Sequence, residues 1–105
     1  MFNINNELWQ LEFVPSLSYH LRRPNGAYTI GVCNDLDKKI YISEELEGAL
    51  LKKVICHELT HAAMFSYDVE LSLKQEEILA DIIATYGEEI IHITNTLFDK
   101  IKGRH

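Results

Sequence analysis

The first forty or so residues have the apolar spacing of β-strands. Polar and apolar side chains alternate over residues 8–14, and Pro15 then interrupts the run. A β-rich run follows over residues 27–33, and a short apolar run covers residues 39–42. The pair Asn25-Gly26 and the polar segment 34–37 are turn signals, so we expect a hairpin across residues 34–37.

From Ser43 onward the apolar spacing becomes helical. Acidic residues directly after Ser43 suit a helix start, but Gly48 favours a break. The pattern therefore predicts a continuous helix that begins near Ala49 and runs to about Phe65.

A second helix is predicted for the end of the chain. Ser72 and Gln75 have the spacing of a capping box, and apolar residues then recur at helical intervals to about Lys102. Gly103 is a stop signal, and Gly87 is expected to kink this segment or to end a first helix. Strands followed by helices predict one α+β domain over residues 1–105, with a small twisted sheet of about three strands on two principal helices.

Composition narrows the classes of function. The formal net charge is −6, which disfavours direct binding to nucleic acid. Two cysteines, Cys33 and Cys56, cannot form a disulfide scaffold. The chain has neither an apolar run long enough to cross a membrane nor a secretory signal at its start, so we expect a cytoplasmic protein without a membrane partner.

The motif His57-Glu58-Leu59-Thr60-His61 is the strongest chemical signal in the sequence. Histidines four apart on a helix project from one face, one turn apart, so both ring nitrogens can reach a single zinc ion. Glu58 is placed to reach a water at the open position of the metal rather than the metal itself. We therefore expect one zinc per chain, with Glu58 as general base.

A catalytic zinc usually has three protein ligands, and the predicted second helix supplies candidates for the third. Glu77 and Asp81 are four apart and share a face. With Glu77 as the ligand, Asp81 can accept a hydrogen bond from the ring nitrogen of a ligating histidine that faces away from the metal. Glu76 is the competing ligand, although it points about 100° away from Glu77.

Other candidates carry weaker signals. Tyr67, Tyr86 and His92 are the residues that could stabilise a transition state beside the metal, and each is more often a packing or surface residue. His20 and His105 are expected in a loop and in the tail.

These residues together resemble the gluzincin metallopeptidases. The helix motif at residues 57–61 and the segment Glu77-Ile78-Leu79-Ala80-Asp81 are most similar to the small phage- and mobile-element-associated ImmA/IrrE-type family. The resemblance implies a minimal zincin-like domain, zinc bound by His57, His61 and Glu77, and Asp81 orienting a histidine. Asp81 stands where that family often has asparagine.

The expected function is zinc-dependent hydrolysis of peptide bonds. The resemblance implies an intracellular protein substrate, such as a repressor of a phage or mobile element. A substrate strand could add to the edge of the sheet along the β-rich run over residues 29–33. Two alternatives stay open: a zinc-containing binding module that sequesters a partner without turnover, and a zinc hydrolase of small amides.

Overall fold

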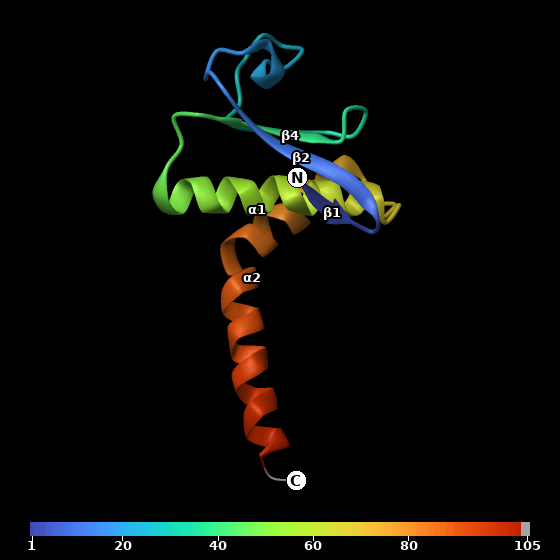
Figure 1. The fold of residues 1–105 in the computed structure, drawn as a ribbon, viewed down its shortest axis with the longest axis vertical. Helices are drawn as coiled ribbons and strands as arrows, with labels where there is room; N and C mark the ends of the chain where they lie inside the picture. Colours follow the sequence, from blue (N-terminus) through green and yellow to red (C-terminus); the bar gives the residue numbers. More distant parts are fainter. Residues whose placement is uncertain (104–105) are drawn as a thin grey trace.

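A computed structural model of the chain describes residues 1–103, and the predicted tail residue His105 lies outside them. The elements, in chain order, are β1 (Phe2–Ile4), β2 (Glu7–Val14), a 3-10 turn η1 (Tyr19–Leu21), β3 (Gly31–Asn34), β4 (Lys39–Ser43), α1 (Gly48–Ser66) and α2 (Leu73–Lys102). The predicted α+β class is confirmed, with two principal helices (Figure 1).

The four strands form one mixed sheet in the order β1-β2-β4-β3. β2 and β4 are parallel, whereas β1 pairs with β2 and β3 pairs with β4 in antiparallel fashion, which confirms the predicted hairpin across residues 34–37. The third strand is shorter than expected, because it begins at Gly31 rather than at residue 27. In the strand order β3 lies at one edge of the sheet, paired on one side only among residues 1–103.

One strand, β1, was not expected. It is joined to β2 by Asn5 and Asn6, which both adopt positive φ angles of 50° and 64°. Two consecutive left-handed residues form the tight turn that suits the right-handed twist of a hairpin, and asparagine tolerates this conformation well. The sheet therefore has one strand more than the sequence predicted.

Each face of the sheet has its own small core. On one face, Trp9, Ile40 and Ile42 are buried against Val54 and Ala62 of α1. On the other face, the core consists of Val14, Leu21 of η1 and Tyr41. Figure 1 shows α1 lying across one side of the sheet and the η1 segment on the other side. Because α1 packs against the sheet from Leu51 to Ser66, the sheet determines which face of this helix points away from it.

A buried hydrogen bond joins the sheet to the end of α1. The Trp9 indole Nε1 donates to the Ser66 Oγ at 2.8 Å, and the Asn5 amide donates to the Ser66 carbonyl oxygen at 2.9 Å. Both Trp9 and Ser66 are buried, so the indole N–H has no access to water as an alternative partner.

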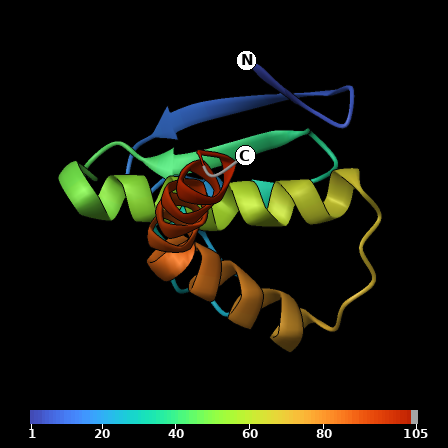
Figure 2. The same cartoon turned by 90° about the horizontal axis from the view of Figure 1, so that it is seen from below.

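The predicted start of α2 is confirmed. Ser72 caps the helix, and the reciprocal hydrogen bonds between Ser72 and Gln75 complete the capping box. The helix continues through Gly87 to Lys102 as one element, but its axis turns along the way, as Figure 2 shows from below.

The second half of α2 projects away from the rest of the chain (Figure 1). The molecule measures 57 × 30 × 28 Å and has a radius of gyration of 16.1 Å, whereas a compact chain of this length has about 13 Å. Among the described residues, no helix has the length and apolar character that crossing a membrane requires.

Candidate metal centre

The two histidines of the sequence motif lie on the face of α1 that meets α2. His57 and His61 are one helical turn apart, and their Nε2 atoms approach each other to 3.2 Å. His61 is buried, while the side chain of His57 is about one-fifth exposed. The helix thus presents two ring nitrogens to the same point, as the spacing predicts.

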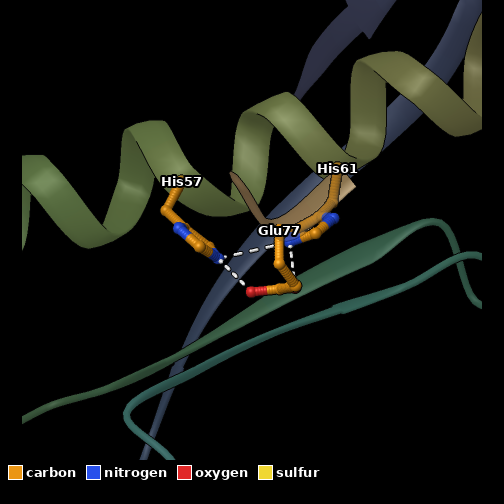
Figure 3. Close-up of side chains that lie close together, drawn as sticks. All are labelled: His57, His61 and Glu77. Atoms are coloured by element: carbon orange, nitrogen blue, oxygen red, sulfur yellow. Dashed lines mark hydrogen bonds and ion pairs between the residues drawn. The ribbon is translucent and has the colours of Figure 1, made fainter. Parts of the chain in front are cut away.

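The third member of the group comes from α2. The two Glu77 carboxylate oxygens lie 2.7 Å from the His61 Nε2 and 3.3 Å from the His57 Nε2 (Figure 3). One donor atom from each of His57, His61 and Glu77 can be chosen so that all lie within 4.8 Å of one another. The capping box that starts α2 at Ser72 brings Glu77 onto the second turn of that helix, opposite α1.

A carboxylate lies behind each histidine ring. The Asp81 Oδ1 is 3.0 Å from the His57 Nδ1, and the Glu76 Oε1 is 2.6 Å from the His61 Nδ1. The Asp81 side chain is 69% exposed, but the Glu76 side chain is only 15% exposed. A carboxylate beside Nδ1 favours the tautomer with the proton on that atom, and this tautomer leaves the two Nε2 atoms as lone-pair donors.

This arrangement concentrates electron pairs at one point. Two Nε2 lone pairs and a carboxylate converge there, and they repel one another unless a cation or additional protons lie between them. The spacings also suit a metal, because two ligands about 2.1 Å from a tetrahedral ion lie about 3.4 Å apart. The residues His57, His61 and Glu77 could therefore bind a metal ion.

Glu58 follows the first histidine and is held in a different environment. It is 7% exposed, and burial raises the pKa of its carboxyl above the usual range, an effect that His57 and His61 oppose. Its side chain lies against Gly31 of β3: a Cβ added there would come within 3.2 Å of the Glu58 Cγ and 3.4 Å of its Oε2. The absence of a side chain at Gly31 is thus what leaves room for Glu58 beneath the edge strand.

A cleft of about 340 Å³ opens beside the group. Its walls come from the segment before and at the start of β3, from α1 and from α2, and consist of Arg23, Thr29, Ile30, Gly31, Leu50, Lys53, Val54, His57, Glu58, Glu77 and Asp81. The volume lies at the lower end of the range for ligand sites in proteins. Both Glu58 and Glu77 face this cleft, so a molecule bound in it would reach the group directly.

The three weaker candidates lie elsewhere. Tyr67 directly follows α1 and is 59% exposed, and Tyr86 on α2 is 56% exposed. His92 is exposed on the projecting half of α2. The structure does not bring any of these three residues into the cleft that holds Glu58 and Glu77.

Two features of the site were not found from the sequence. Glu76, considered there as a competing ligand, contacts the Nδ1 of His61 rather than the converging Nε2 atoms. The sequence did carry a signal for this role of Glu76, namely its position next to Glu77 on a helix. Neighbouring helical side chains about 100° apart can reach the two nitrogens of the same imidazole ring. Arg23 and Lys53 of the cleft gave no signal, since their approach depends on the tertiary fold.

Comparison of the chain with models of protein families, with curated proteins and with solved structures finds no match.

Proposed function

We propose that this protein is a zinc-dependent peptidase. The observation that carries the proposal is the convergence of His57, His61 and Glu77 beside a buried glutamate that directly follows the first histidine. Two histidines and one carboxylate form the ligand set of many catalytic zinc sites, which keep one further position for water or substrate. The resemblance of the sequence to ImmA/IrrE-type metallopeptidases agrees with this ligand set.

Each residue of the site has its own role in the proposed hydrolysis. Zinc bound by the three ligands would polarise the scissile carbonyl and acidify a water molecule. Glu58 takes the proton of the attacking water and passes it to the leaving amine. Its raised pKa suits this role, because a carboxylate with a higher pKa is a better base at neutral pH. Asp81 and Glu76 keep the histidine rings in the ligating tautomer.

An extended peptide is the substrate that the cleft fits best. The Ser43 N–H donates to the Ile30 carbonyl oxygen at 3.0 Å, which fixes the alternation of hydrogen bonds between β3 and β4. By that alternation the backbone groups of Gly31 and Cys33 point to the open edge of the sheet. A substrate strand can pair with them and pass along the cleft, with its scissile bond beside Glu58.

Proline at Gly31 tests this pairing. Gly31→Pro removes the outward N–H, and Gly31→Ala is its control because it adds a Cβ but keeps that N–H. We expect the proline variant to lose peptide hydrolysis well beyond the alanine variant. Equal hydrolysis by the two variants would rule out pairing at this residue.

The substrate class follows from the resemblance. ImmA/IrrE-type peptidases act within cells on proteins, so we propose an intracellular protein substrate, such as a repressor of a phage or mobile element. An open cleft along a strand edge agrees with a protein substrate, because it can accept a chain that continues beyond both ends of the site.

Replacing the proposed base tests the proposed activity. Zinc-loaded wild-type protein and the Glu58→Gln variant are incubated with a peptide library and with casein, and Glu45→Gln is the control because Glu45 is exposed outside the cleft. We expect Glu58→Gln to lose hydrolysis by about 10²–10⁴-fold while keeping its zinc. Equal cleavage by wild type and Glu58→Gln would contradict the proposal. Wild-type protein that holds zinc but cleaves no peptide would favour a binding module or a hydrolase of small amides.

A further inference from the structure

The projecting half of α2 has an apolar stripe that nothing in the described chain covers. Six large side chains form it, each between 48% and 60% exposed: Ile90, Ile91, Ile93, Leu97, Phe98 and Ile101. At 100° per residue they lie together within about 160° of the helix surface. Thr94 is the one polar residue within this sector, and its Oγ1 donates to the Ile90 carbonyl oxygen at 2.7 Å. A soluble monomer rarely exposes an apolar face of this kind, so the stripe marks an interaction surface.

Charged residues flank the stripe on both sides. Glu89 and Lys100 lie about 20° apart around the helix, on the side of Ile93. Glu88 and Lys102 lie about 40° apart on the opposite side. On each flank the acidic residue is at the beginning of the stripe and the basic residue is at its end.

This distribution is self-complementary in one orientation. When two helices pack antiparallel, residues on the same flank face each other, so Glu89 of one copy meets Lys100 of the other. The midpoint of Glu89 and Lys100 lies between Thr94 and Asn95, and the midpoint of Glu88 and Lys102 lies at Asn95. The two flanks therefore specify the same register independently. Such agreement is expected when the partner is a second copy of this chain, whereas binding to an unrelated sequence gives no reason for it.

We propose that the stripe on residues 88–102 packs antiparallel against the same stripe of a second copy of this chain. The dimer buries the six apolar side chains and pairs Glu89 with Lys100 twice, by symmetry. Glu88 already lies 2.8 Å from Lys52 of α1, but both side chains are largely exposed, and a carboxylate can accept from a second lysine. A membrane surface fits the stripe less well, because the polar side of this helix segment carries three acidic residues against two lysines and is not lysine-rich.

The second copy would not close the candidate metal centre. Glu77 lies on the second turn of α2, whereas the stripe begins at Ile90 on the projecting half of the helix (Figure 1). Dimerisation and metal binding are therefore separate properties, and either can fail without the other.

Charge exchange tests both the dimer and its orientation. The full chain is examined by sedimentation velocity up to about 100 μM, a range that detects micromolar association. We expect a wild-type dimer that Glu89→Lys or Lys100→Glu alone weakens about tenfold, and that the double variant restores. Asp99→Lys is the matched control: it changes the charge as much as Glu89→Lys but lies opposite the stripe, so the dimer should persist.

Apolar substitution gives a second measurement. Leu97→Glu should yield a monomer whose circular dichroism and metal content match the wild type, because Leu97 is exposed far from the group of His57, His61 and Glu77. A wild-type chain that stays monomeric at the highest concentration would overturn the proposal. So would a dimer that survives Leu97→Glu, a double charge variant that fails to restore association, or a monomer that binds lipid vesicles through the stripe.

Discussion

Adding one methyl group at Gly31 should disturb both the stability and the proposed chemistry of this protein. A Cβ at this position would lie 2.8 Å from the Val54 Cγ1, closer than side chains approach in folded proteins, and 3.2 Å from the Glu58 Cγ. Val54 is buried in the core between the sheet and α1, so it cannot move freely. Overpacking of this kind costs about 1–3 kcal/mol, and a cost of about 2 kcal/mol lowers the Tm of a chain this size by roughly 8–16 °C.

The Gly31→Ala variant is measured by urea denaturation, by thermal unfolding and by zinc-dependent hydrolysis. We expect a lower free energy of unfolding and a lower kcat, since the new methyl group displaces Glu58, while the three proposed metal ligands stay in place. Gly87→Ala on α2 is the control, because its Cβ would meet only the exposed side chain of Ile83 at 3.3 Å, and its effect should stay within about 1 kcal/mol. Unfolding and kcat equal to wild type in Gly31→Ala would refute the close contact between β3 and α1.

Three further predictions follow from individual contacts. Glu76→Gln should lower metal affinity by about 10–100-fold and more than Asp81→Asn does, because the Glu76 carboxylate is much the less exposed of the two. Equal losses of affinity in the two variants would contradict this ranking. Ser66→Ala should lower the free energy of unfolding by about 1–3 kcal/mol in urea titrations, because it leaves the buried Trp9 indole N–H without an acceptor; an unchanged midpoint would exclude that bond. Cys33 is half-buried, and this partial burial raises the pKa of its thiol to about 12. At pH 8.5 iodoacetamide should therefore modify Cys33 in urea but scarcely in the folded chain, with mass spectrometry as the readout; equal rates would contradict the raised pKa.

The helices could be predicted from the sequence because their signals are local. The extent of α1, the capping box at Ser72 and the end of α2 before Gly103 each depend on neighbouring residues, and the structure confirms them. The α+β class also followed from the change in apolar spacing near Ser43.

The order of the strands could not be predicted in the same way. Pairing of β2 with β4 joins residues about thirty positions apart, and alternating side chains do not specify which strand is the neighbour. The first strand was missed although Asn5-Asn6 is a turn signal, because β1 has only three residues. The truncated start of β3 likewise reflects the tertiary position of the segment before it, where Tyr28 forms an isolated bridge with Arg22 and Thr29 donates to the Leu21 carbonyl oxygen instead of pairing with β4.

The group of residues that could bind a metal ion could be predicted only in part. Helical spacing alone places His57 and His61 together, and the proximity of Glu77 required the further assumption that the two helices pack side by side. The role of Glu76 depends on the angle between the helices, which one sequence does not specify. The cleft walls from Arg23 and Thr29 come from an irregular segment, whose path has no periodic signal.

The most direct test is the metal content of the purified protein. Elemental analysis is carried out on the wild type, on Glu77→Ala and on Glu45→Ala, which removes an exposed carboxylate outside the cleft. We predict about one zinc per chain in the wild type and in Glu45→Ala, and a sharp reduction in Glu77→Ala. A wild-type chain that holds no zinc after zinc is supplied, or a Glu77→Ala variant that retains it fully, would contradict a zinc centre built on His57, His61 and Glu77.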